Sequence, residues 1–166
     1  MSDSQTPQFE TDAEFLQLIQ PRDEKYVEEL EEDIFDHGCH EAICVWGSIL
    51  IDGHLRYSIC RKWDIRFNIR RLFFQSRDEA EAYICTEQLK RNDLTSEYKK
   101  YLIGRRFRAD MNIASADFLK NHPEKQLNAD GQISQKYVQK TEIATIIGKE
   151  YNFGFSTVTK YDVYAR

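Results

Sequence analysis

The chain of 166 residues has no apolar run long enough to cross a membrane, which takes about 18–20 residues. Its first twelve residues, MSDSQTPQFETD, are polar and acidic and have neither the basic nor the apolar region of a signal peptide. These two absences argue against a membrane protein and against secretion. We therefore expect a cytoplasmic protein in which residues 1–12 form a disordered tail.

Cysteines in Cys-x-x-Cys spacing are also absent. The four cysteines lie on predicted apolar faces or in a loop, which favours buried, reduced thiols; they are Cys39, Cys44, Cys60 and Cys85. A zinc site is the alternative, because His37 and His40 flank the first of them. The spacing of this tract fits no common structural zinc site, and a predicted strand follows it directly.

Basic residues are scarce at the start of the chain. Residues 1–52 hold 14 acids and 2 bases, whereas residues 53–166 hold 14 acids and 21 bases. The net charge of −5 hides this polarity. The excess of bases in the second part predicts a polyanionic partner for it. A solvated surface whose charges pair with one another is the alternative.

Strand-like and helix-like segments alternate along residues 13–119. Apolar residues make up 41% of the chain, enough for a hydrophobic core. Ser76 and Thr95 are predicted to cap helices, Ser76 in a capping box with Glu79. The expected strands are 15–19 (at an edge), 42–46, 48–51 and 67–74, and the first two expected helices are 23–37 and 53–64. We expect an α/β (α+β) domain over 13–119, a small mixed sheet flanked by helices.

The C-terminal part predicts a second, helical unit. Residues 120–136 are polar and are expected to form a linker. In residues 137–166, Thr141 and Ser156 are expected to cap two helices, which is typical of a helix-turn-helix whose second helix enters the major groove of DNA. The expected turn is longer than the usual one, and an ordinary helical hairpin is the alternative. We expect this unit to be incomplete, because the chain stops at Arg166.

Residues 50–57, LIDGHLRY, carry the most specific local signal. An apolar run ends at Asp52 and Gly53, and a helical pattern begins at once. Glycine lets the backbone turn tightly, and the free amides at the start of the next helix suit an anion. Arg56 in the first helical turn adds a fork of donors that matches phosphate oxygens. The segment therefore predicts a phosphate-binding corner.

A second box strengthens this interpretation. The segment Gly53-His54-Leu55-Arg56 is a Gly-x-x-Arg motif, which we call the first box. Residues 87–91, EQLKR, the second box, follow it by about thirty residues, at the end of a predicted helix. A Gly-x-x-Arg box after a strand, followed by a Glu-Asn-x-x-Arg box, is the pattern of the ParB-like and sulfiredoxin-like superfamily. The chain resembles this superfamily over residues 13–110, and it is most similar to ParB-like proteins of mobile elements.

The resemblance implies a nucleotide site made by both boxes. Its expected ligand is CTP or another nucleotide with Mg²⁺, since a triphosphate needs amides, arginines and a divalent ion together. Glu87 would manage the metal and its water. The residues that would bind the nucleotide or its phosphates are Gly53, His54, Arg56, Gln88 and Arg91.

Three departures from the family patterns bear on this site. Partition proteins usually have a Gly-Glu-Arg-Arg box, so this chain lacks one cation there. Gln88 is one methylene longer than the family asparagine. His54 stands where sulfiredoxins carry their catalytic cysteine, so sulfinate chemistry is not expected. His54 either contacts phosphate or has a structural role. A pocket for an unknown ligand and a vestigial pocket both remain open.

We expect a ParB-like DNA-binding protein, acting in partition or transcriptional control on a mobile element, with double-stranded DNA as partner and as a homodimer. A nucleotide hydrolase or small-molecule kinase using Glu87 and Asp52 is the alternative, although Asp52 before glycine is also an ordinary turn residue. A protein-interaction module is the third. The DNA-binding residues are expected on the last helix and on the basic helix before it: Thr157, Thr159, Lys160, Lys99, Lys100, Arg105, Arg106 and Arg108.

Overall fold

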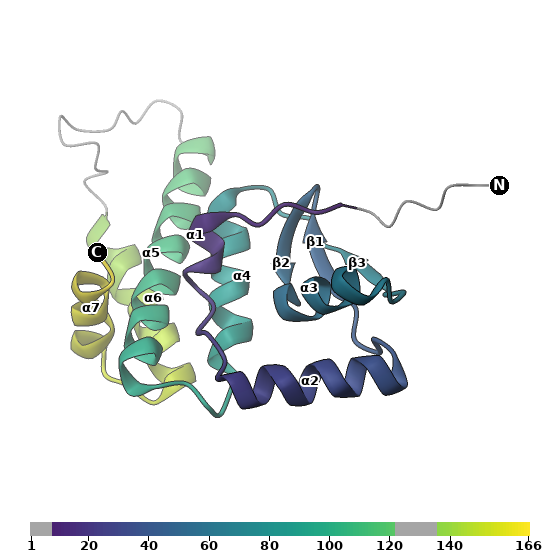
Figure 1. Ribbon diagram of the computed structural model, residues 1–166. Helices are drawn as coiled ribbons and strands as arrows, with labels where there is room; N and C mark the ends of the chain where they lie inside the picture. The colour runs from purple at the N-terminus through teal and green to yellow at the C-terminus, as the bar shows by residue number, and fades with distance from the viewer. Residues whose placement is uncertain (1–7, 122–135) are drawn as a thin grey trace. The chain divides into compact units, whose positions relative to one another are not determined.

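The computed structural model describes residues 8–121 and 136–166 (Figure 1). The chain divides into two compact units. Unit 1 is Met1–Phe74 and unit 2 is Gln75–Arg166. The elements of unit 1 are α1 (Ala13–Leu16), α2 (Glu24–His37), β1 (Ile43–Trp46), β2 (Ile49–Asp52), α3 (His54–Trp63) and β3 (Ile69–Arg71). Those of unit 2 are α4 (Arg77–Leu89), α5 (Ser96–Asn121), α6 (Lys136–Tyr151) and α7 (Phe155–Tyr164).

The sheet of unit 1 is small and mixed, as the sequence predicts. Its strand order is β2-β1-β3, with β1 antiparallel to β2 and parallel to β3. Gly47 has a φ of 59° in the turn of the β1–β2 hairpin, a conformation that glycine adopts without strain. Helix α3 connects β2 to β3. The expected sheet flanked by helices is therefore confirmed.

The core of unit 1 lies between the sheet and the helices α2 and α3. Ile43 and Val45 of β1 are fully buried and Leu50 of β2 almost so, and they cluster with Ile34 of α2 and Ile59 of α3. Each such burial stabilises the fold by about 1.5–3 kcal/mol. This core fixes the end of β2 against the start of α3, which is where the predicted phosphate corner lies.

The expected edge strand at residues 15–19 is wrong, because the chain forms α1 there. Asp12 caps this helix, and its Oδ1 accepts hydrogen bonds from the amides of Glu14 and Phe15, both 3.0 Å long. Phe15 and Leu18, the buried residues, are three apart, which is helical spacing and not the alternation of a strand. Residues 1–7 of the predicted tail lie outside the described residues, whereas Glu10 pairs with Ile49 beside the sheet.

Unit 2 is helical, and α5 contacts each of α4, α6 and α7. The predicted caps are confirmed: Ser76 Oγ accepts from the amide of Glu79 at 3.2 Å, and Thr95 Oγ1 accepts from that of Tyr98 at 3.2 Å. The carboxylate of Glu79 accepts from the amide of Gln75 instead of that of the cap residue, so the capping box is shifted by one residue. Within the described ranges, no helix is long and apolar enough to span a membrane.

The C-terminal helices differ from the prediction at both of their caps. Thr141 lies inside α6, which already begins at Lys136. Ser156 lies in the first turn of α7, whose N-cap is Gly154. The connection between the two helices therefore consists of residues 152–154, with Asn152 at a φ of 60°. The expected long turn is wrong, since three or four residues is the length usual for a helix-turn-helix. Most of the predicted linker, residues 122–135, lies outside the described residues.

Candidate functional site

The first box lies in unit 1, where β2 ends and α3 begins (Figure 1). Gly53 adopts a left-handed conformation, with φ 87° and ψ 26°. It is the N-cap of α3, and no side chain caps the helix there. The first amides of α3 are therefore available to an anion. The structure has the strand–glycine–helix junction that the sequence predicts, and anion binding at it remains a prediction.

Arg56 folds back over this junction. A Cβ atom built on Gly53 would lie 3.2 Å from Arg56 Nη2 and 3.1 Å from Ile43 Cδ1, so a larger residue would displace the guanidinium. Arg56 Nη1 pairs with Glu41 Oε2 at 2.7 Å, and Nη2 donates to Asp52 Oδ2 at 3.2 Å. Its buried Nε has no hydrogen-bond partner among the described residues. The guanidinium is thus held beside Gly53, and its Nε–H remains without a partner within the residues that the structure describes.

Glu41 is a member of this cluster that the sequence interpretation missed. It lies fifteen positions before Arg56, and no local pattern connects the two residues. Its side chain is 75% exposed, compared with 20% for Arg56. An exposed carboxylate gains little from such a pair, so an anion with several oxygens can replace it on the guanidinium.

His54 is the second polar group at the corner. Its ring is largely buried, and neither Nδ1 nor Nε2 has a hydrogen-bond partner in the described part of the chain. Burial lowers the pKa of His54, and the nearby Asp52 carboxylate opposes this shift. A buried imidazole has at least one N–H donor to satisfy. This makes a contact between His54 and an anionic ligand physically favourable.

The second box lies in unit 2, at the end of α4. Gln88 is buried, and its Oε1 accepts a hydrogen bond from Arg91 Nη1 at 2.7 Å. Arg91 also binds Asp93 through two donors, at 3.0 and 2.7 Å. Glu87 pairs with Lys90 at 2.6 Å. The box is thus a local network, and its i, i+3 contacts are of a kind that sequence spacing can reveal.

The two boxes belong to different units, so their meeting in one nucleotide site remains a prediction. Within unit 1, the structure brings together Asp52, Gly53 and Arg56. Within unit 2, it brings together Gln88 and Arg91. No group of three or more His, Cys, Asp or Glu side chains in the described residues can hold a metal ion. The expected role of Glu87 towards Mg²⁺ therefore needs oxygen ligands from a nucleotide as well.

The predicted DNA-reading helix is α7. Val158 and Ala165 are buried on its inner side, and Ser156 and Lys160 are exposed one turn apart. Thr157 and Thr159 are half-buried, and the hydroxyl of Thr159 donates to the carbonyl of Ser156 at 3.1 Å. The exposed face therefore carries Ser156 and Lys160 together with the apolar and aromatic side chains of Phe155, Val163 and Tyr164. The sequence pattern predicts a helix cap at Ser156 and gives no sign that its side chain lies on the exposed face.

The basic helix before it, α5, uses its arginines to hold unit 2 together. Arg105 pairs with Glu81 of α4 at 2.7 Å, and Arg106 donates to Tyr151 Oη of α6 at 2.6 Å. A third arginine makes the corresponding contact with α7, Arg108 with Asp162 at 2.9 Å. These guanidiniums have protein partners already, which leaves few donors for phosphates. Lys99 and Lys100, in the first turns of α5, are half-buried, and Lys99 Nζ lies 5.9 Å from the ring centre of Phe153.

Comparison with solved structures identifies the fold. One similar structure is the C2221 form of a pNOB8-like ParB-N domain, with a TM-score of 0.63 and 20% identity over 92% of this chain. A second is a pNOB8-like ParB N-domain, with a TM-score of 0.61 and 19% identity over 93% of this chain. This chain has the fold of a ParB N-domain. It spans 64% and 60% of the length of the two matched chains.

The ParB-N fold confirms the resemblance inferred from the two boxes, at the level of the fold. The likeness covers both units, including the helices that follow the second box. No protein-family model and no curated protein matches the sequence. The ParB-N fold is therefore shown by the structure, and the chemistry of its sites has to be argued from the residues themselves.

Proposed function

We propose that this chain is a ParB-like DNA-binding protein in which α6 and α7 form a helix-turn-helix. The observation that carries this proposal is the pair α6 and α7, joined by three residues and packed on α5, with Ser156 and Lys160 exposed on α7. In a helix-turn-helix, the second helix enters the major groove, and its exposed residues reach the base edges. The protein would act in partition or transcriptional control on a mobile element, in the cytoplasm and as a homodimer.

In this proposal, the basic residues predicted to bind DNA have three different roles. Lys160 faces the groove together with Ser156, and the flanking Thr157 and Thr159 contribute through the parts of their side chains that remain exposed. Lys99 and Lys100 contact phosphates near the start of α5. The arginines of α5 position the helices and do not bind DNA.

The test is a salt titration of the full chain on a labelled random-sequence 30-base-pair duplex, followed by fluorescence anisotropy. Replacing Lys160 by alanine should reduce the slope of log affinity against log salt by about one. Lys25→Ala is the matched control, since Lys25 is exposed in unit 1 and should leave the slope unchanged. Absence of binding at low salt, or equal effects of both variants, would contradict the DNA-binding proposal.

We also propose that the corner of Gly53, His54 and Arg56 binds the phosphates of a nucleotide, with Gln88 and Arg91 contributing if the two units bring them there. Three features of unit 1 support this: the uncapped start of α3, the free Nε of Arg56 and the unpartnered ring of His54. CTP with Mg²⁺ is the first ligand to test. Arg56→Ala should abolish binding in equilibrium dialysis, whereas Arg66→Ala, at an exposed arginine of the same unit, should not.

An enzymatic role is the second candidate function, because Asp52 lies directly beside the proposed phosphate corner. A carboxylate there can act as a general base on an attacking water or hydroxyl, and Glu87 would manage the metal only if the two units bring it to the same corner. The readout is phosphate release from CTP or ATP with Mg²⁺, compared between the wild type and the Asp52→Asn variant. Binding without turnover would leave the nucleotide as a ligand only.

A further inference from the structure

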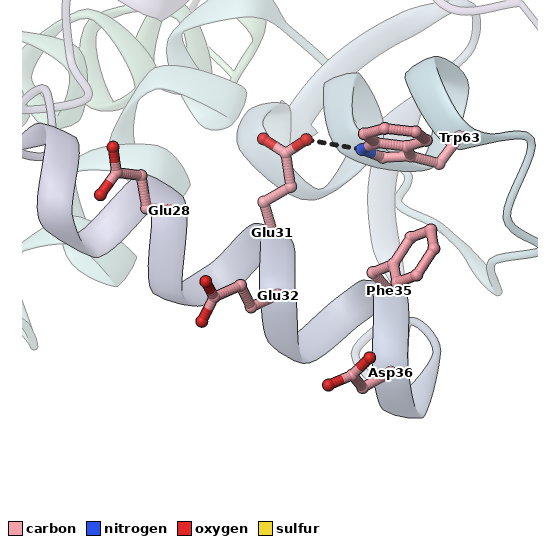
Figure 2. A pocket seen from close by; sticks show the side chains of 6 residues that line it. All are labelled: Glu28, Glu31, Glu32, Phe35, Asp36 and Trp63. Carbon is pink, nitrogen blue, oxygen red and sulfur yellow. Dashed lines mark hydrogen bonds between the residues drawn. The ribbon is translucent and has the colours of Figure 1, made fainter.

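Helices α2 and α3 of unit 1 border an open groove of about 350 Å³, which follows α2 from Glu28 to Asp36 (Figure 2). Neither the proposed DNA-binding helix nor the phosphate corner contributes a residue to it. The residues that line the groove are Glu28, Glu31, Glu32, Phe35, Asp36 and Trp63. We call it the α2–α3 groove.

Two aromatic side chains form one end of the α2–α3 groove. Phe35 and Trp63 stack edge to face, with ring centres 5.4 Å apart, and they are 61% and 46% exposed. An exposed aromatic pair beside a concave surface is a common sign of a binding site, because it adds apolar area and ring faces for a partner. Figure 2 shows both rings at the same end of the groove.

The carboxylates of the groove fall into two classes. Glu31 points to Trp63 and accepts hydrogen bonds from Trp63 Nε1 and Lys62 Nζ, each 2.5 Å long (Figure 2). These bonds lower the pKa of Glu31. Glu28, Glu32 and Asp36 have no ion-pair or hydrogen-bond partner among the described residues. Three unneutralised charges therefore line the groove beside the aromatic pair.

The chain itself shows that a cation suits the aromatic end. Lys62 Nζ lies 4.9 Å from the ring centre of Trp63, in a cation–π contact. Lys62 therefore occupies one face of the Trp63 ring and pairs with one carboxylate, that of Glu31. The ring of Phe35 and the row of free carboxylates remain for cations of a partner.

The spacing of the free carboxylates indicates which backbone conformation of a bound segment would match them. Glu28, Glu32 and Asp36 are four residues apart along α2, so successive carboxylates are separated by about 6 Å along the helix axis. An extended peptide presents side chains on the same face every second residue, about 6.6–7 Å apart. Basic side chains at alternate positions of an extended segment therefore match the row. A nucleic acid does not, because its phosphates would meet carboxylates.

We propose that the α2–α3 groove binds an extended basic segment of a partner protein, with Arg or Lys at alternate positions. Successive cations pair with Glu28, Glu32 and Asp36, and the last one packs on Phe35 and Trp63. The acidic first part of the chain then recruits a protein, whereas the basic second part is left for DNA. This inference does not depend on the proposed DNA binding or on the phosphate corner.

The test uses a fluorescein-labelled peptide of four Arg-Ser repeats and the full chain, followed by anisotropy at low salt. A peptide of four Glu-Ser repeats and a block peptide of four Arg and then four Ser serve as probe controls. The alternating basic peptide should bind at least about fivefold more tightly than the block peptide, and the acidic peptide should not bind.

Variants of the groove locate the binding. Trp63→Ala and Phe35→Ala leave the net charge unchanged and should each weaken binding about threefold to tenfold; Glu32→Gln should weaken it without touching the aromatic pair. The matched controls are Phe73→Ala, at an aromatic residue that is 87% exposed elsewhere in unit 1, and Glu29→Gln, at an exposed carboxylate of α2 that does not line the groove. Equal losses in groove and control variants would overturn the proposal, and so would equal affinity for the alternating and block peptides. Dimerisation of the chain that is lost in Trp63→Ala, without peptide binding, would assign the groove to a second copy instead.

Discussion

The backbone of Gly104 in α5 lies against the backbone of Tyr161 in α7. A Cβ atom built on Gly104 would be 2.2 Å from the carbonyl oxygen of Tyr161 and 2.8 Å from the Cβ of Ala165. Arg108, one turn further along α5, binds both the carboxylate and the carbonyl of Asp162 at 2.9 Å. Glycine allows the close approach and arginine holds it, so α5 fixes the position of the helix that we propose reads DNA.

Replacing Gly104 by alanine should therefore destabilise unit 2. The added methyl group meets backbone atoms, which cannot move aside as a side chain does, and we expect a loss of about 1–3 kcal/mol in the free energy of unfolding. Urea unfolding followed by circular dichroism measures it. Gly154→Ala is the control, since a Cβ there has no atom within 4 Å and only the poorer N-cap of α7 should lower the stability, by less than about 1 kcal/mol. Equal stability of the two variants would contradict the close packing of α5 and α7.

Arg105 should matter for stability and not for DNA affinity. Its Nε and the Oε1 of Glu81 are 2.7 Å apart and mostly shielded from solvent, and Arg105 Nη1 also donates to Tyr101 Oη at 2.9 Å. Arg105→Ala leaves the Glu81 carboxylate without its cation, and we expect a loss of about 1–3 kcal/mol in the free energy of unfolding.

A double-mutant cycle separates this structural role from a DNA contact. Adding Glu81→Gln to Arg105→Ala should recover part of the lost stability, because the uncompensated charge is removed. The salt slope of duplex binding should be the same in Arg105→Ala as in the wild type. A slope reduced by about one would instead assign Arg105 to a phosphate contact, as the sequence interpretation had it.

The strand–glycine–helix corner could be predicted because its signals are local. An apolar run, an Asp-Gly pair and a helical pattern follow each other within a dozen residues, and the structure has β2, Gly53 and α3 in that order. Helix α1 could not be predicted, because four residues are too few to show a period. The start of α6 was misplaced because Thr141 inside a helix looks the same in the sequence as a cap. Threonine is a common N-cap residue, but here α6 begins earlier in the chain, at Lys136.

The roles of the arginines could not be read from the sequence for a different reason. A count of bases does not distinguish a solvated guanidinium from one that has a protein partner far along the chain. Arg106 and Arg108 find theirs at Tyr151 and Asp162, across two helix–helix contacts. Glu41 joins Arg56 in the same way. The excess of bases in the second part of the chain can reflect a polyanionic partner or internal ion pairing, and for these arginines it reflects internal ion pairing.

The four thiols should be unreactive in the folded protein. All of them are buried, and burial together with the neighbouring Cys39 thiol raises the pKa of Cys60 to about 12. Burial also raises the pKa of Cys85. Since the thiolate is the reactive form, a thiol reagent at pH 8 should label the native chain far more slowly than the chain unfolded in urea, where thiols have pKa values of about 8.5. Fast stoichiometric labelling of any cysteine without urea would contradict this burial.

The stability of unit 1 should fall as the pH drops below about 6.5, because of His54. Burial lowers the pKa of His54 in the folded protein, so just below pH 6.5 the unfolded chain binds a proton that the folded chain does not. The unfolded state is then favoured by acid, and the loss amounts to at most about 1.4 kcal/mol per pH unit until the folded-state pKa is reached. Above this window, the contribution of His54 is constant.

Urea unfolding between pH 5.0 and 7.5 measures the effect. The wild type should lose stability through this window, and His54→Gln should flatten the slope. His40→Gln is the matched control, at an exposed histidine of the same unit. The lowered pKa values of Glu31, Glu97 and Glu150 act near and below their ordinary value of 4.5, and the raised pKa of Asp110 in unit 2 acts in the opposite direction, so the comparison with His54→Gln isolates the effect of the imidazole. If 50 mM phosphate restores the stability of the wild type at pH 5.5 but not that of His54→Gln, the protonated ring binds the anion directly. An unchanged slope in His54→Gln would contradict the role of His54 at the corner.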